Sequence, residues 1–277
     1  MQIAMIEDKI VPMAELGPAY LDRGLYFGDG IYEALRSYNG KIFAFDEHLQ
    51  RLSGGLAAVK ITGVDIEQIR RRVQKAFDAA AIDNALIYFH ITRGSTIRNH
   101  VWEPGLKPNF FLTITELPDP PQQKTKGFAV STYPDLRWKR CNIKSLNLLP
   151  NVFALNDAAA KGCAEAILVN EDGLITEGSH SAFLGILDQK LWTTPLTSNI
   201  LPSITRKFVI QAAKDIKLEL TEKSLTPQQA ADADELFVAG TTFDIAPVVK
   251  FDDKTIGNGT PGKYTKLLIN RFISFTV

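Results

Sequence analysis

The chain has 277 residues, of which 45% are hydrophobic and 22% charged, enough to bury the core of one large domain or two ordinary ones. Its 31 basic and 31 acidic residues cancel, which argues against steering toward nucleic acid or an anionic membrane surface. Cys141 and Cys163, the only cysteines, are too few for a disulfide framework or a thiolate metal cluster. The sequence has neither a secretory signal core nor an apolar run of about 18 residues. We therefore expect a cytoplasmic protein with two reduced thiols, no bound metal, no nucleic-acid partner and no membrane partner.

Apolar runs flanked by turn residues predict strands in the first half of the chain. These runs are Ile3–Ile6, Lys41–Phe45, Ala85–Arg93 and Phe110–Thr115. An amphipathic helix is predicted over Asp65–Ala81, because apolar side chains recur there at three- and four-residue spacings while basic side chains occupy the other face.

A proline-rich polar stretch at 118–125 predicts a domain boundary, because neither a helix nor a central strand can run through it. It separates a small N-terminal α/β domain, residues 1–117, from a larger C-terminal domain, residues 126–277. The predicted class is α+β, and small-molecule sites favour the cleft between two such domains.

The second half alternates short apolar runs with polar turns, a pattern typical of an antiparallel meander. The predicted strands of this meander are Ala166–Asn170, Leu174–Glu177, Ala182–Leu187 and Leu191–Thr194, and Glu235–Ala239 adds another strand. Helices are predicted to cover this sheet at Asn151–Lys161, which Gly162 would end, and at Ser203–Ile216.

Lys144 is a single cation among residues that otherwise belong in a core or at a helix start, in the segment CNIKSLNLL at 141–149. Desolvation, or nearby cations such as Lys139 and Arg140, would favour the neutral amine that attacks aldehydes. Taken alone, Lys144 is also compatible with a solvated surface lysine.

Glu177 opens a small polar interruption, EGSHS, between two apolar runs. The glycine at 178 allows a ligand to come close. A carboxylate at this point can keep a pyridine nitrogen protonated, which makes such a ring an electron sink. The alternative interpretation is a strand-end glutamate that faces water.

Two segments are suited to bind a phosphate dianion. In LPSITR, residues 201–206, a loop enters a helix whose free N–H groups and dipole attract anions. In GTT, residues 240–242, a polar turn follows a strand and presents backbone N–H donors. Arg51 can add a full positive charge. Each segment alone is equally explained as a cap or a turn, and Arg51 as a surface arginine.

Taken together, these segments resemble the fold-type IV family of pyridoxal 5'-phosphate (PLP) enzymes. That family contains D-amino acid aminotransferases, branched-chain aminotransferases and aminodeoxychorismate lyases. The resemblance spans nearly the whole chain in matching order and spacing. Its segments are DRGLYFGDGIYE at 22–33, EH at 47–48 followed by Arg51, NIKSLN at 142–147, TEG at 176–178 and GTT at 240–242.

The resemblance implies a two-domain fold, with a small N-terminal α/β domain and a larger C-terminal domain that has a β-barrel-like antiparallel sheet and covering helices. It implies that Lys144 is the Schiff-base lysine and proton carrier, and that Glu177 pairs with the pyridine nitrogen. Leu201 would pack on the ring and Arg137 would lie near its phenolic oxygen. The residues implied to hold the phosphate are Arg51, Ile204, Thr205 and Thr241.

Arg98 and His100 are the most discriminating pair within the family, because they resemble the substrate-carboxylate trap of D-amino acid aminotransferases. Tyr32 would add its hydroxyl, and Tyr88 matches a substrate-side tyrosine of the family. The resemblance also implies a homodimer in which Arg98 and His100 serve the neighbouring subunit's site. Fixing the carboxylate fixes which face of the substrate Cα meets Lys144, which favours D-alanine and D-glutamate. The alternative is an exposed basic loop.

His180 and Ala182 depart from the family pattern, in which a serine and an asparagine are expected. A histidine near the ring-binding glutamate can alter cofactor hydrogen bonding or substrate size preference, so the side-chain specificity stays open. His90, on an apparent strand, either points into the site or pairs within the sheet.

The implied activity is a ping-pong transfer of amino groups between D-amino acids and 2-oxo acids. The alternatives within the family are a branched-chain L-amino acid aminotransferase and, with less support, an aminodeoxychorismate lyase. A non-catalytic PLP-binding module is an alternative from another class. A dinucleotide-binding oxidoreductase is disfavoured, because Gly28 and Gly30 are not followed by a third glycine at Glu33.

Overall fold

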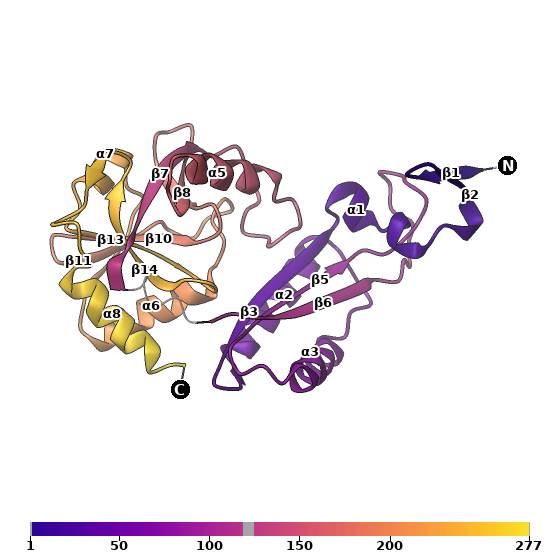
Figure 1. The fold of residues 1–277 in the computed structure, drawn as a ribbon, viewed down its shortest axis with the longest axis horizontal. Helices are drawn as coiled ribbons and strands as arrows, with labels where there is room; N and C mark the ends of the chain where they lie inside the picture. The colour runs from indigo at the N-terminus through magenta and orange to yellow at the C-terminus, as the bar shows by residue number, and fades with distance from the viewer. Residues whose placement is uncertain (1, 119–124, 277) are drawn as a thin grey trace.

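The structure is a computed structural model that describes residues 2–118 and 125–276. The elements gather around two β-sheets, one formed by the first half of the chain and one by the second, and a short N-terminal hairpin projects at one end (Figure 1). Within the described residues, no helix combines the length and the apolar character needed to cross a membrane.

The first sheet has four antiparallel strands in the order β4-β3-β5-β6. The strands of this half are β1 (Ile3–Ile6) and β2 (Lys9–Pro12) in the hairpin, and β3 (Gly30–Tyr38), β4 (Lys41–Ile42), β5 (Ala85–Thr92) and β6 (Asn109–Glu116) in the sheet. The helices are the short turns Met13–Glu15 and Pro18–Leu21, α1 (Arg23–Phe27), α2 (Phe45–Ala58) and α3 (Ile66–Ala80).

Helices α2 and α3 contribute to one buried core with the first sheet. The predicted amphipathic pattern holds in α3, where Ile69, Val73 and Phe77 are buried. The helix begins where predicted because the Asp65 carboxylate accepts the free amides of its first turn, including that of Glu67 at 2.9 Å. This packing holds β3 firmly, and β3 carries the first residues of the site.

The second sheet has nine strands, with the path β12-β11-β10-β13-β14-β7-β8-β9 and β15 paired to β14. Its strands are β7 (Phe128–Pro134), β8 (Glu165–Val169), β9 (Ile175–Gly178), β10 (Ala182–Leu187), β11 (Lys190–Thr193), β12 (Leu220–Glu222), β13 (Glu235–Gly240), β14 (Asp244–Phe251) and β15 (Lys254–Thr255). The helices of this half are α5 (Leu149–Ala160), α6 (Ile204–Asp215), α7 (Pro227–Ala231) and α8 (Lys263–Ile273).

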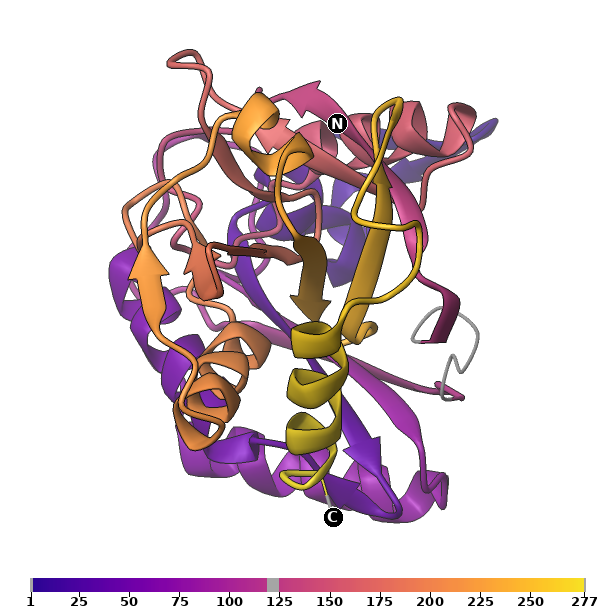
Figure 2. The same ribbon diagram turned by 90° about the vertical axis from the view of Figure 1, so that its left-hand side faces the viewer.

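The second sheet curls on itself. Strand β9 is the last strand at one end of the strand order, and β10 lies near the other end. The two strands nevertheless come close at the turn that joins them, where the Gly178 amide at the end of β9 donates to the carbonyl of Ser181, next to β10, at 2.8 Å. Helices α6 and α8 lie side by side (Figure 2) and share a buried core with β10 and β13. The curl brings the β9–β10 turn to the same region as the turn after β13.

The α+β class, with a small first sheet and a larger barrel-like second sheet under covering helices, is confirmed by this architecture. The predicted continuous antiparallel meander is wrong. The hairpins β8–β9 and β10–β11 do form, but β10 pairs with β13, and the pairs β7–β8, β7–β14 and β11–β12 are parallel. A turn between two apolar runs predicts that these two runs pair as a hairpin, but it does not indicate which strands from distant parts of the sequence pair with them.

The predicted strand Lys41–Phe45 is also wrong beyond its first two residues, because α2 already begins at Phe45. The predicted helix Asn151–Lys161 begins two residues earlier, at Leu149, where Pro150 suits the first turn. Cys141 and Cys163 are free thiols, as predicted. Most of the predicted boundary at 118–125, namely residues 119–124, lies outside the described residues, so the division into 1–117 and 126–277 stays a prediction.

Candidate active site

A half-open cavity of about 770 Å³, including its mouth, lies where β3 and α2 meet the second sheet. The predicted site residues that line it are Tyr32, Arg51, Arg137, Lys144, Glu177, Leu201, Ile204, Thr205 and Thr241. The sequence interpretation gave no individual role to several other lining residues, among them Trp138, Asn147, Asn151, Ser179 and Ser203. The structure therefore gathers residues that are up to 209 positions apart (Tyr32 to Thr241) around one space.

Lys144 is held in place through its backbone. Its carbonyl accepts the Tyr32 amide of β3 at 3.0 Å, and the Leu146 amide donates to the carbonyl of Gly30 at 3.1 Å. The side chain then extends along Tyr32, with Nζ 4.1 Å from the centre of the aromatic ring. The segment around Lys144 thus adds to the edge of β3, which fixes where the amine enters the cavity.

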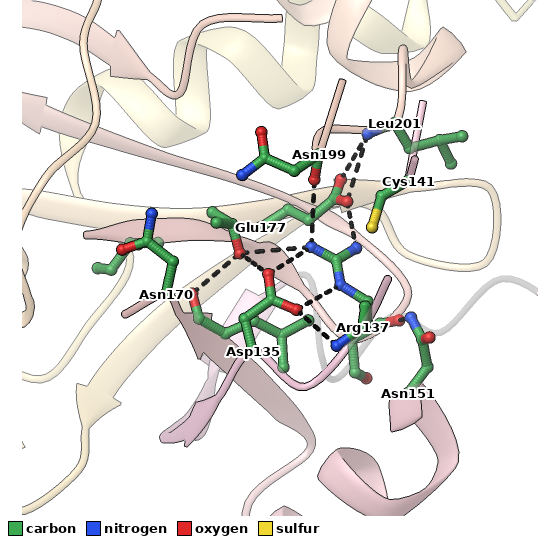
Figure 3. Close-up of polar contacts among 12 residues, drawn as sticks. Asp135, Arg137, Cys141, Asn151, Asn170, Glu177, Asn199 and Leu201 are labelled. Atoms are coloured by element: carbon green, nitrogen blue, oxygen red, sulfur yellow. Dashed lines mark hydrogen bonds and ion pairs between the residues drawn. The ribbon is translucent and has the colours of Figure 1, made fainter. Parts of the chain in front are cut away.

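Glu177 is the last residue but one of β9 and is buried. Its Oε1 accepts Nη1 of Arg137 at 2.5 Å, and the Leu201 amide lies 3.3 Å from both carboxylate oxygens (Figure 3). Burial disfavours the charged form more than Arg137 and Leu201 favour it, so the pKa of Glu177 is raised to about 6. This carboxyl group can therefore hold or release a proton near neutral pH.

Arg137 is itself fixed by Asp135, whose carboxylate accepts Nε and Nη2 at 2.8 Å each. The Thr176 hydroxyl donates to the same carboxylate at 2.7 Å. The two acids thus share one guanidinium. Burial raises the pKa of the neighbouring Cys141 thiol to about 11, so this thiol stays protonated at neutral pH.

Arg51 reaches the cavity from α2 and is held from behind by Glu33 of β3. The pair is bidentate, with Nε–Oε1 at 2.9 Å and Nη2–Oε2 at 2.6 Å, and Nη1 donates to the Pro202 carbonyl at 3.1 Å. His48 Nδ1 lies 2.8 Å from the same carboxylate. Burial opposes the charge on Glu33, but Arg51 and His48 outweigh it and lower the Glu33 pKa to about 2.

Two further parts of the cavity wall are the start of α6 and the turn after β13. Helix α6 begins at Ile204, and the hydroxyl of its N-cap residue Ser203 accepts the Arg206 amide. The other amides of the first turn have no partner within the helix, and they lie at the end of the helix that faces the cavity. The second is the turn between β13 and β14, where the Thr241 hydroxyl donates to the Ala34 carbonyl at 3.1 Å. Together with Arg51, these groups lie where the sequence predicts that a phosphate binds.

Tyr88, Arg98 and His100 do not line this cavity of their own chain. Tyr88 lies beside Tyr32, with ring centres 5.8 Å apart, and its hydroxyl contacts Nδ1 of His90 at 3.0 Å. His90 also stacks on Phe111 across the sheet.

The loop of Arg98 and His100 is exposed but anchored. Buried Arg23 donates to the Asn99 and His100 carbonyls at 2.5 and 3.2 Å and pairs with Asp29 at 2.8 Å. A loop held in this way can present both side chains to a neighbouring molecule.

The β9–β10 turn forms the remaining wall and is organised by Glu165 of β8, a residue that the sequence interpretation missed. This carboxylate is fully buried and accepts the Ser179 amide at 3.1 Å, the Ser179 hydroxyl at 2.5 Å and the Ser181 hydroxyl at 2.7 Å. His180 Nδ1 lies 2.9 Å from it. An acid placed among strand residues is the only signal the sequence offers for this arrangement.

Comparison with known proteins identifies the family of the chain. The model of the amino-transferase class IV family matches residues 30–251. A D-alanine aminotransferase of Bacillus licheniformis is 35% identical over 266 residues, which cover 95% of this chain and 93% of that protein. A D-alanine aminotransferase of Listeria monocytogenes is 37% identical over 256 residues, covering 91% and 88%. The branched-chain amino acid aminotransferase of Escherichia coli has the same fold, with a TM-score of 0.87 over 96% of this chain and 92% of that one, at 23% identity.

A curled mixed sheet that packs on a smaller antiparallel sheet, with a lysine and a buried glutamate in the cavity between them, defines a fold-type IV protein. The chain belongs to the aminotransferase class IV family. It is thus a PLP-dependent transaminase, and its substrates are amino acids and 2-oxo acids.

The lining residues fit PLP by their chemistry. Lys144 offers an amine for the aldehyde, Glu177 an acid for the pyridine nitrogen, and Arg51 with the start of α6 a positive end for the phosphate. Among the described residues, no group of histidine, cysteine and acidic side chains is arranged to hold a metal ion.

Proposed function

We propose that this transaminase moves amino groups between D-amino acids, with D-alanine and D-glutamate as donors, and 2-oxo acids by a ping-pong reaction. The observation that carries the proposal is the 35 to 37% identity, over nearly the whole chain, to proteins named D-alanine aminotransferase. The anchored Arg-x-His loop supports it independently, because a guanidinium and an imidazole suit a substrate carboxylate.

Bound PLP supplies an aldehyde that bonds covalently to amines and a ring that accepts electrons from the substrate Cα. In the proposal Lys144 is the residue that binds the cofactor covalently and, once released, carries the proton to and from Cα. Its backbone attachment to β3 sets the side of the cavity from which that proton moves.

Glu177 is proposed to keep the pyridine nitrogen protonated. Because the pKa of Glu177 is raised to about 6, a proton can be shared between this carboxyl group and the pyridine nitrogen. A positive charge on the ring nitrogen would be stabilised by the neighbouring carboxylate. Leu201, whose amide fixes Glu177, would cover the ring face. Arg137 would lie near the phenolic oxygen while Asp135 keeps its guanidinium in place.

The phosphate is proposed to rest on the start of α6, with Ile204 and Thr205, on the Thr241 turn and on Arg51. Glu33 and the Pro202 carbonyl use donors of Arg51 and thereby set its orientation. Because each of these groups is positioned by buried contacts, little reorganisation is needed on binding.

Arg98 and His100 are proposed to bind the substrate carboxylate in the neighbouring subunit of a homodimer, with Tyr32 and Tyr88 on the cavity side. Their exposure and their distance from the cavity of their own chain support this assignment. A carboxylate held on that side would direct the Cα hydrogen of a D substrate toward Lys144.

The experiment that tests the function is a half-reaction with enantiopure alanine. Purified PLP-loaded protein is mixed with D-alanine or L-alanine without an acceptor, and the visible absorbance of the cofactor is followed. The proposal predicts that D-alanine converts the cofactor to the pyridoxamine form and releases pyruvate. Conversion by L-alanine alone, or by L-leucine in place of D-alanine, would overturn the D preference and favour a branched-chain transaminase.

A further inference from the structure

The imidazole of His180 stands at the cavity wall in a turn that is built around one buried acid. The side chain of His180 is 38% exposed, whereas Glu165 behind it is 0% exposed. The neighbouring Ser179 and Ser181 side chains are buried and both donate their hydroxyl hydrogens to Glu165. The turn is therefore rigid at its base and exposes only the histidine.

The hydrogen positions around Glu165 follow from its charge. Hydrogen bonds and the contact with His180 outweigh the effect of burial and lower the Glu165 pKa, so the group is a carboxylate and only accepts. The Ser179 hydroxyl gives its hydrogen to Glu165 at 2.5 Å, so it too can only accept from Nδ1 of His180, at 3.2 Å. Nδ1 must then carry a hydrogen, and Nε2 is the nitrogen left for a ligand.

The ring is also fixed in its plane. His180 packs on Phe243 with ring centres 4.9 Å apart and an interplanar angle of 48°. Its carbonyl and the Ser181 backbone lie beside Gly240, where an added Cβ would come within 3.5 and 3.7 Å of them. The imidazole thus stands next to the Gly240–Thr241 turn, on the same wall of the cavity.

Among residues 2–118 and 125–276, each of the other cationic side chains that line the cavity already has an ion-pair partner or a proposed role. Arg51 is paired with Glu33, and Arg137 is paired with Asp135 and Glu177. Lys144 is the amine proposed to bind the cofactor. A second negative charge on a substrate would therefore have to find another partner in this cavity.

We propose that His180 is a specificity-determining residue whose Nε2, in the protonated ring, binds the side-chain carboxylate of dicarboxylic amino acids and 2-oxo acids. The inference rests on the proposed function, in which Arg98 and His100 take the other carboxylate. A protonated ring between Glu165 and a substrate carboxylate forms a charge-assisted contact on each side. D-glutamate and 2-oxoglutarate have the required second carboxylate, and D-alanine and pyruvate lack it.

The test compares two donors in two variants. His180→Ser removes the ring at an exposed position, and His180→Gln is the matched control, because it keeps similar length and a neutral N–H donor. We expect the ratio of kcat/KM for D-glutamate to that for D-alanine to fall about 10-fold or more in His180→Ser, the effect of one lost charge-assisted hydrogen bond. The ratio in His180→Gln should fall by less. The visible spectrum of bound PLP should stay close to that of the wild type in both variants.

Two results would overturn the proposal: an unchanged ratio in His180→Ser, which includes an equal loss with both donors, or a wild-type enzyme that uses D-alanine but not D-glutamate. Failure of the proposed function gives a different result, because the wild type would then use L donors. In that case the ratio of kcat/KM for L-glutamate to that for L-alanine tests the role of His180. A fall of about 10-fold or more in His180→Ser would support the role, and an unchanged ratio would contradict it.

Discussion

Arg137 and Glu177 form an ion pair at the wall of the cavity, with Nη1 2.5 Å from Oε1 and each side chain only 7% exposed. Asp135 holds the other edge of the guanidinium, so the pair has little freedom to rearrange. This relationship fixes the position of the one acidic group proposed to meet the cofactor ring. Burial outweighs the effect of Arg137 and raises the pKa of Glu177 to about 6.

Replacing Glu177 with glutamine tests its proposed role toward the ring. The amide keeps the shape of the side chain but cannot stabilise a positive charge on the pyridine nitrogen. We expect kcat for D-alanine with 2-oxoglutarate to fall about 100-fold or more, the usual range for losing a positioned acid or base, while PLP still binds. Steady-state kinetics on the PLP-saturated variant check this, and a kcat within about threefold of wild type would contradict the assignment.

The raised pKa of Glu177 also predicts a pH effect on the stability of PLP-free protein. Because the folded pKa of about 6 lies above the ordinary value of 4.5, the native state holds this proton more tightly than the unfolded state. The contribution of Glu177 to the free energy of unfolding is therefore full below pH 4.5 and is lost as the pH rises through about 6. It amounts to about 2 kcal/mol.

Urea unfolding of PLP-free wild type and Glu177→Gln at pH 4.5 and pH 7 measures this contribution. The free energy of unfolding of the wild type should drop by about 2 kcal/mol more over this interval than that of the variant. Parallel pH profiles for the two proteins would show that Glu177 has an ordinary pKa.

The contribution of Glu33 to the free energy of unfolding should change with pH in the opposite direction to that of Glu177. Its folded pKa of about 2 lies below 4.5, so its stabilising effect is full above pH 4.5 and is lost as the pH falls toward 2. We expect Glu33→Gln to lower the free energy of unfolding at pH 7 by about 3 kcal/mol and to weaken PLP binding, because Arg51 loses its bidentate partner.

A matched control for Glu33 is Glu67→Gln. Glu67 also pairs with an arginine, Arg70, but its side chain is 63% exposed, and exposed ion pairs contribute about 0 to 1 kcal/mol. Urea unfolding and titration with PLP provide both readouts. A Glu33→Gln variant that binds PLP as tightly as the control would contradict the positioning of Arg51 by Glu33.

The sequence predicts the parts of this structure that depend on neighbouring residues. The caps Asp65 and Ser203 and the apolar periodicity of α3 are local, and the helices begin where these signals stand. Strand β3 was missed because its buried positions include the charged Glu33 and Arg36, which break the apolar alternation. Both are charged side chains with partners distant in the sequence.

The site divides in the same way. Motif resemblance predicted Lys144 and Glu177, and both line the cavity. The residues that position them come from long-range contacts, such as Glu33 with Arg51 and Glu165 with the 179–181 turn. Nothing near these acids in the sequence indicates which basic or hydroxyl group they meet, because the pairing depends on how the two sheets pack.

The proposed sharing of Arg98 between subunits can be tested by mixing two inactive variants. In a heterodimer of Lys144→Ala and Arg98→Ala chains, one site contains an intact lysine and receives an intact arginine from its neighbour. We expect the two separate variants to have little activity and a refolded equal mixture to recover about a quarter of the wild-type activity, since half of the dimers are mixed and each has one complete site. No recovery on mixing would place Arg98 and Lys144 in the same chain's site.

In the proposed function, the amine of Lys144 binds PLP covalently in the cavity between the two sheets. Borohydride reduction of the PLP-loaded protein, followed by peptide mapping, tests it most directly. We expect a reduced pyridoxyl group on the peptide that contains Lys144 and no such label in Lys144→Ala. A wild-type protein labelled on another lysine, or left unlabelled at Lys144, would contradict it.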